Sequence, residues 1–205
     1  WENPQQPALS VLPSVELPPA PLSEHVFVPG KSQTTLLLAW PGPNSTTDEF
    51  DTATQIDSVI GRFGLNRRLG QVIREQHGLA YSVSSGVSGG FGPGPWRIAA
   101  GVDPANRDQA AELARSEVRR LLDTGITEQE LADVQSFLVA SMPLRFETPG
   151  GQASAVLEML RYNYPLAYWQ HYPDKVRSIT RDQALAVAAK YLDPDRYVQV
   201  SAGPE

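Results

Sequence analysis

The sequence predicts an α+β domain in which an antiparallel or mixed β-sheet is covered by helices. Short segments such as 79–87 and 96–102 alternate between large apolar and small residues, as strands do. Longer segments repeat apolar residues every three or four positions, as amphipathic helices do. The 205 residues fit one large domain or two small ones. We predict a single domain over residues 23–205.

Residues 1–22 form a proline-rich segment before that domain. Six prolines lie among the first 21 residues, at positions 4, 7, 13, 18, 19 and 21. This composition favours extended polyproline conformations and disfavours helix. We therefore predict a linker or strap over residues 1–22, with a disordered tail as the alternative.

Two strands and a helix are expected next. Residues 25–28 and 33–40 have strand composition and are separated by a turn at Pro29-Gly30, so we predict a hairpin. Thr46-Thr-Asp-Glu49 matches a capping box. The helix that it opens is predicted to continue to about Phe63.

A second helix is predicted over Leu65–Gln76, with Gly78 as its cap. Strands over Leu79–Val87 and Trp96–Val102 should follow, and the glycine-rich segment Ser88–Pro95 between them is expected to be a mobile loop.

The second half of the chain is predicted to be mainly helical. Asp103-Pro104 has the form of an N-cap followed by proline, and Gly125 should end that helix. Thr127–Glu130 is a second capping box, and the helix behind it should end before Pro143. Further elements are expected as helices at 148–162, 166–176 and 180–192 and a closing strand at 197–200.

Composition excludes several classes of function. The formal net charge of −6 and the absence of a basic run argue against nucleic-acid binding. There are no cysteines, which excludes disulfides and thiolate metal sites. No apolar run is long enough to span a bilayer. We expect a soluble domain with no signal peptide in this sequence, and both cytoplasm and periplasm stay open as compartments.

The chain lacks the residues for a zinc or nucleophilic site of its own. Its three histidines are His25, His77 and His171, so neither H-E-x-x-H nor its inverted form can be written. The segment Ser85–Gly89 has small residues but lies in a strand and loop with no helix after it, unlike a nucleophile elbow. We therefore predict no catalytic residue, no metal ligand and no cofactor within this chain.

One segment carries the most information. Residues 61–83 join a basic amphipathic helix to a small-residue strand and place Arg74 seven residues before Tyr81. Together with the Gly125–Leu131 corner and the closing Gly203-Pro204, this segment resembles the C-terminal, zinc-free domain of pitrilysin/insulinase-type zinc peptidases, which include the mitochondrial processing peptidases.

The resemblance implies a chamber of two walls, with zinc on a homologous domain in the same polypeptide or on a separate subunit. It implies that Arg74 and Tyr81 bind the peptide backbone of the substrate and stabilise the developing oxyanion, with Ser82 and Ser84 as weaker contacts. From the residues alone, a structural role is the alternative: a cation near a helix C-terminus at Arg74, and a buried phenol beside Val83 at Tyr81.

The chain alone is therefore expected to be inactive. A catalytically inactive scaffold or assembly subunit of the same fold is the main alternative, because family relatives include core subunits of a respiratory complex. A peptide-binding module that uses the sheet edge is a third hypothesis. A homodimer of the isolated domain also stays open, because the face that meets a partner would be exposed.

Overall fold

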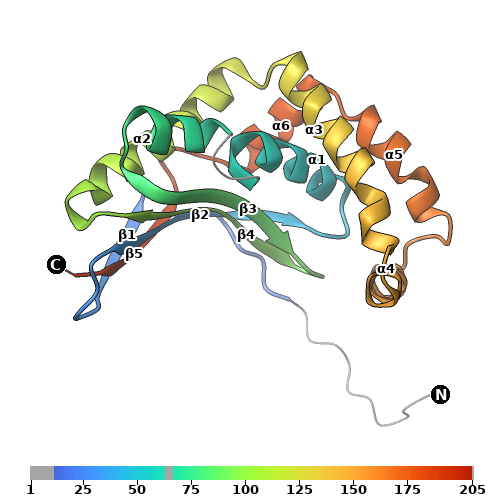
Figure 1. Cartoon of the computed structure of the whole chain (residues 1–205), viewed down its shortest axis with the longest axis horizontal. Coiled ribbons are helices and arrows are strands. Elements are labelled where there is room, and N and C mark those ends of the chain that lie inside the picture. The colour runs from blue at the N-terminus through green and yellow to red at the C-terminus, as the bar shows by residue number, and fades with distance from the viewer. Residues whose placement is uncertain (1–11, 63–66, 205) are drawn as a thin grey trace, which may run out of the picture.

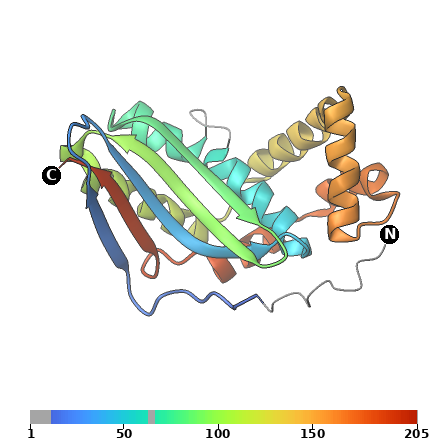
Figure 2. The same cartoon turned by 90° about the horizontal axis from the view of Figure 1, so that it is seen from below.

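The computed structural model describes residues 12–62 and 67–204. It contains a five-stranded mixed sheet in the order β1-β5-β2-β4-β3, with helices over one face (Figure 1) and the other face open (Figure 2). The predicted α+β class is confirmed. The strands are β1 (Leu22–Phe27), β2 (Thr34–Asn44), β3 (Ala80–Gly89), β4 (Pro93–Val102) and β5 (Val198–Gly203).

The helices follow the predicted order. They are α1 (Asp48–Asp57), η1 (Ser58–Arg62), η3 (Gly70–Gln76), η4 (Pro104–Asn106), α2 (Arg107–Thr124), α3 (Glu128–Ser141), η5 (Met142–Phe146), α4 (Pro149–Tyr162), α5 (Tyr168–Ser178) and α6 (Arg181–Tyr191). η1 and η3 are π-helical. The predicted ends at Phe63 and Leu65 lie outside the described residues.

Local capping explains several of these boundaries. Reciprocal capping boxes begin α3 at Thr127 and α6 at Thr180, and Gly125 ends α2 with a φ of 69°. The predicted capping box at Thr46 is wrong. Thr47 is the N-cap of α1 and makes no side-chain capping bond, because the hydroxyls of Thr46 and Thr47 donate to Asn44 instead.

The predicted hairpin of the first two strands is also wrong. β1 pairs in parallel with β5, and β5 pairs antiparallel with β2, so the last strand lies between the first two. The connection from β1 to β2 turns around the end of β5, where Val28 N donates to Gly203 O at 2.7 Å. A Cβ at Gly203 would lie 2.4 Å from Thr34 Oγ1, so glycine allows this close passage.

The predicted loop Ser88–Pro95 is mostly strand. β3 continues to Gly89 and β4 begins at Pro93, which leaves a short turn between them. Glycine makes this tight pairing available: a Cβ at Gly94 would lie 2.3 Å from Ser88 O. The glycines of this hairpin therefore serve close backbone approach, as glycines in strands commonly do.

The hydrophobic core lies between the sheet and the helices. The inner face of the sheet contributes Leu36, Leu38, Trp40, Trp96 and Ile98, and the helices contribute Ala53, Ile56, Val118, Leu121 and Ala188, all at most 3% exposed. The other face, here called the open face, carries Thr35, Leu37, Ala39, Ser82, Ser84, Arg97, Ala99, Val198 and Val200 by strand register. No helix of the described part of the chain covers that face in Figure 2, and these residues are half-buried or exposed.

A buried arginine joins two distant parts of the fold. Arg68, just before η3, is 6% exposed and donates two hydrogen bonds of 2.6 Å to the carboxylate of Glu130 and one of 3.1 Å to Gly125 O. Its guanidinium also lies 3.7 Å from Glu117, which is 4% exposed. Arg68 thereby fixes the η3 segment to the corner between α2 and α3.

A buried carboxylate lies under the β3–β4 hairpin. Asp57 is fully buried, and its Oδ1 accepts a 3.2 Å hydrogen bond from Trp96 Nε1. Its Oδ2 has no hydrogen-bond partner in the described part of the chain. Burial raises the pKa of Asp57, and the hydrogen bond from Trp96 and the charge of Arg62 offset only part of this effect.

This arrangement predicts how stability depends on pH. Because the folded-state pKa of Asp57 exceeds its ordinary value of 3.8, its carboxyl favours folding below that value, and this contribution is lost as pH rises through the folded-state pKa. Asp57→Asn keeps an acceptor for Trp96 without the charge. We expect the variant to be more stable at pH 7 by on the order of 1 kcal/mol and equal to the wild type near pH 3.

Urea unfolding of both proteins at several pH values measures this difference. The exposed Asp123→Asn is the matched control and should leave the pH profile unchanged. A variant at Asp57 that loses stability at pH 7 would show that the charged carboxylate is favourable there.

Candidate functional site

The corner between η3 and β3 positions Arg74. Gly78 N donates to Arg74 O and Leu79 N donates to Ile73 O, both at 2.9 Å, and Gly78 adopts a φ of 65°. The predicted cap at Gly78 is therefore confirmed, and the left-handed conformation is the reason for glycine there. Ile73 is fully buried, whereas Arg74 on the next position is half-buried. The buried side chain of Ile73 thus fixes the backbone from which the Arg74 side chain extends.

A β-bulge turns Tyr81 outward. Ala80 pairs with Val102 and Ser82 pairs with Gly101, so Tyr81 is the extra residue on β3. Its side chain is 79% exposed. The alternative of a buried phenol beside Val83 is therefore wrong, because the bulge shifts the alternation and removes Tyr81 from the face of Val83. Ser82 and Ser84 are also exposed.

The site offers two uncommitted donors. Within residues 12–62 and 67–204, neither the Arg74 guanidinium nor the Tyr81 hydroxyl makes a hydrogen bond, ion pair or ring contact. A guanidinium and a phenol can both donate hydrogen bonds to a carbonyl oxygen or to an oxyanion.

The side chains do not fit a zinc site. The described part of the chain contains no group of three or more His, Asp or Glu side chains that could hold a metal ion. His25 Nδ1 lies 2.8 Å from Ser201 Oγ, and His77 Nδ1 lies 2.8 Å from Val72 O. His25 thus contacts β5 and His77 contacts η3, so the two imidazoles do not meet at one site.

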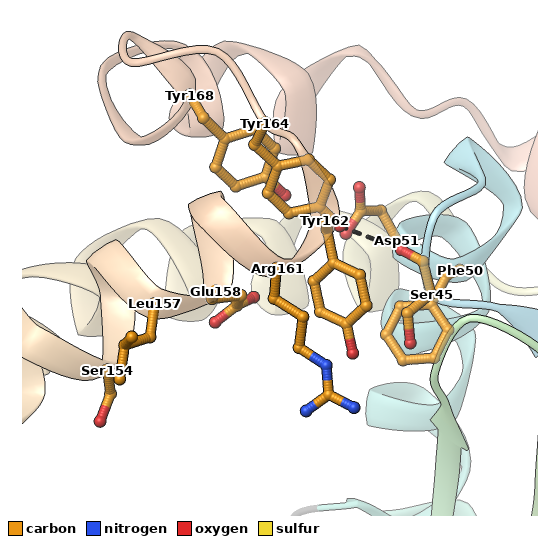
Figure 3. A pocket seen from close by; sticks show the side chains of 10 residues that line it. All are labelled: Ser45, Phe50, Asp51, Ser154, Leu157, Glu158, Arg161, Tyr162, Tyr164 and Tyr168. Carbon is orange, nitrogen blue, oxygen red and sulfur yellow. Dashed lines mark hydrogen bonds between the residues drawn. The ribbon is translucent and has the colours of Figure 1, made fainter. Parts of the chain in front are cut away.

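A tyrosine-lined pocket was not anticipated from the sequence. It has a volume of about 430 Å³ and lies between α4, the start of α5 and the start of α1 (Figure 3). Tyr164 stacks on Tyr168 with ring centroids 4.2 Å apart, and its hydroxyl donates to Ser45 O. Burial raises the pKa of Tyr168 far above its ordinary value, so this phenol stays protonated. We assign this cluster to the packing of α4 and α5.

Comparison with known proteins agrees with this fold. A family model described as the peptidase M16 inactive domain matches residues 3–138. The chain belongs to the peptidase M16 inactive-domain family. This confirms the resemblance to the zinc-free domain of pitrilysin-type peptidases and assigns the chain to the zinc-protease-like proteins.

Individual relatives of this M16 domain differ in what they are named. An uncharacterized zinc protease of Streptomyces coelicolor is 28% identical over 163 residues, which are 73% of this chain and 34% of that protein. A non-peptidase homolog of Helicobacter pylori is 28% identical over 57% of this chain and 27% of that protein. The M16 inactive domain of Pseudomonas fluorescens has a TM-score of 0.87 at 28% identity, covering 98% of this chain and 47% of that one.

The M16 domain described here thus spans between about a quarter and a half of the length of these relatives. None of its helices within the described ranges has the length and apolar character needed to cross a membrane.

Proposed function

We propose that this M16 inactive domain forms one wall of a peptide-binding chamber and that Arg74 and Tyr81 position the substrate for a zinc site on a homologous partner domain. The observation that carries the proposal is the outward turn of Tyr81. The bulge exposes its phenol at the corner after η3 that carries Arg74, and neither side chain has a hydrogen-bond or ion-pair partner among residues 12–62 and 67–204.

The chemistry follows from the two donors. The Tyr81 hydroxyl and the Arg74 guanidinium would hold the carbonyl oxygen of the peptide bond next to the reacting one, or the oxygen on which negative charge develops. Donors fixed before the reaction stabilise such charge more than mobile water does. Zinc on the partner domain would supply Lewis-acid chemistry, and this chain would supply orientation and hydrogen bonds.

A scaffold role is the second candidate, and one observation favours it. The Helicobacter pylori relative is named a non-peptidase homolog. In a scaffold, Arg74 and Tyr81 would contact a partner protein and not a substrate. Peptide binding by the isolated chain through a sheet edge is the third candidate. The compartment and a homodimer of the isolated domain stay predictions of the sequence.

Reconstitution tests the proposal. We expect this chain alone to leave a quenched fluorogenic peptide library intact, and a mixture with its zinc-bearing half to cleave it. Size-exclusion chromatography confirms that the two chains assemble, and metal analysis confirms that zinc is bound. Cleavage only in the mixture supports the chamber role. A correctly assembled, zinc-loaded mixture without activity supports the scaffold role.

A further inference from the structure

A pocket under the N-terminal strap lies on the open face, away from Arg74 and Tyr81. The strap is defined here as residues 12–21. Together with the ends of β2, β4 and β5 it encloses about 350 Å³. Figure 2, which looks onto the open face, shows the strap leaving β1 and running along the β5 side of the sheet. This pocket, the strap pocket, is lined by Val15, Glu16, Pro18, Ala39, Trp40, Pro41, Pro93, Gly94, Pro95 and Val198.

The strap is held in place over this pocket. Arg196, just before β5, donates from Nε to Pro18 O at 3.0 Å and from Nη2 to Leu17 O at 3.3 Å. The Leu17 side chain packs against the hydrophobic core. The outer wall of the pocket is therefore attached to the domain by hydrogen bonds and by apolar contact.

The lining selects for apolar groups. Four of its residues are prolines, which have no backbone N–H to offer to a polar guest. Ala39 on β2 is paired with Val198 on β5, and these two neighbouring residues form the floor of the pocket. A large apolar side chain would exchange water for these surfaces, and burial of apolar area is favourable by roughly 25 cal/mol per Å².

The charges at the rim suit a peptide. Arg97 is exposed on the open face, paired with Ala39 in the sheet register and two residues from Pro95. It makes no ion pair or hydrogen bond in the part of the chain that the structure describes. Glu16 lies on the strap side of the pocket. Arg97, beside the lining residue Ala39, offers a donor and Glu16 on the strap offers an acceptor to the carbonyl and amide groups of an extended backbone.

The register places this pocket at a defined separation from Tyr81. The row of Ser82, Gly101 and Thr35 lies four residues before the row of Gly86, Arg97 and Ala39. From Ser82 on β3 to Ala39 on β2, the separation is therefore about 13 Å along the strands and about 10 Å across them. The diagonal of roughly 16 Å corresponds to about five residues of an extended chain.

We propose that the strap pocket binds a large apolar side chain, of leucine or phenylalanine size, about five residues from the peptide unit held at Tyr81. The proposal rests on the proposed function, because it takes the same open face as the substrate wall. Ser84 and Ala99 lie in the row between the two positions, and their small side chains let a peptide backbone approach the sheet.

Methyl NMR of the 205-residue chain tests this proposal without the zinc-bearing half. The probes are acetylated decapeptides of serine, threonine and glutamine with one central leucine, or with alanine in its place. We expect the leucine peptide to shift the methyl signals of Ala39 and Val198 and to bind at least about tenfold more tightly. Ala39→Phe should fill the pocket and abolish this preference.

Ala202→Phe, on the same face but away from the pocket, is the matched control and should keep the preference. Val198→Phe repeats the test if Ala39→Phe does not fold. Equal affinity for the two peptides, or no shift at Ala39 and Val198 at millimolar concentration, would overturn the proposal. Tyr81→Phe should leave the leucine preference unchanged, so failure of the strap pocket is distinguishable from failure of the chamber role.

Discussion

Tyr81→Phe is expected to lower kcat/KM of the assembled, zinc-loaded enzyme by a factor on the order of 10² to 10³. The phenol is 79% exposed, so removal of its hydroxyl should change the stability of the domain by less than about 0.5 kcal/mol. A loss of activity would therefore report on the reaction. Because the hydroxyl is proposed to meet developing charge, kcat should fall more than KM rises.

Steady-state cleavage of one fluorogenic peptide gives both constants. Tyr162→Phe is the matched control, since it removes a phenol from α4 at the other end of β3, and it should retain full activity. A loss below about threefold in Tyr81→Phe would exclude the proposed role. The scaffold alternative predicts instead that Tyr81→Phe changes assembly with the partner.

Arg68→Ala is expected to destabilise the domain by about 3 to 5 kcal/mol, the typical cost of breaking a buried ion pair. The substitution removes both hydrogen bonds to Glu130 and the bond to Gly125 O. It also leaves Glu117, which is 4% exposed, with Arg120 as its remaining ion-pair partner in the described part of the chain. Arg107→Ala is the control: it removes an exposed pair with Asp108 and should cost at most about 1 kcal/mol.

Denaturant unfolding at pH 7 measures the stability of both variants. The loss of stability as pH falls below 4.5, here called the acid limb, adds a second readout. Burial raises the pKa of Glu130, but hydrogen bonds from Arg68 and Thr127 outweigh it and lower the pKa to about 2. The stabilisation is present above the ordinary value of 4.5 and is lost as pH falls toward 2. Arg68→Ala should flatten this limb. A cost below about 1 kcal/mol would mean that the network contributes little.

The sequence predicted where helices and strands lie along the chain better than it predicted which strands pair in the sheet. Capping residues such as Thr127 and Gly125 act within a few positions, so their signals can be read locally. The pairing of β1 with β5 depends on residues more than 170 positions apart, as in Leu22 with Val198, and no local pattern encodes it. The adjacency of two strands at a Pro-Gly turn therefore gave a wrong hairpin.

The candidate site shows the same limit. The spacing of Arg74 and Tyr81 could be read from the sequence, but the exposure of Tyr81 could not, because a single extra residue at the bulge reverses the alternation. Arg68 was visible only as part of a basic motif. Its burial depends on Glu117 and Glu130, which α2 and α3 bring to it. The prolines of the strap pocket come from three separate segments.

The position of β5 between β1 and β2 has a consequence for biosynthesis. A chain that emerges from the ribosome in order can form the β2–β4–β3 meander and its helices early. The strap and β1 have no strand to pair with until β5 has been made, since β1 contacts the sheet through β5. One edge of β2 therefore stays unprotected during most of synthesis, which exposes the nascent domain to aggregation and makes its final step slow.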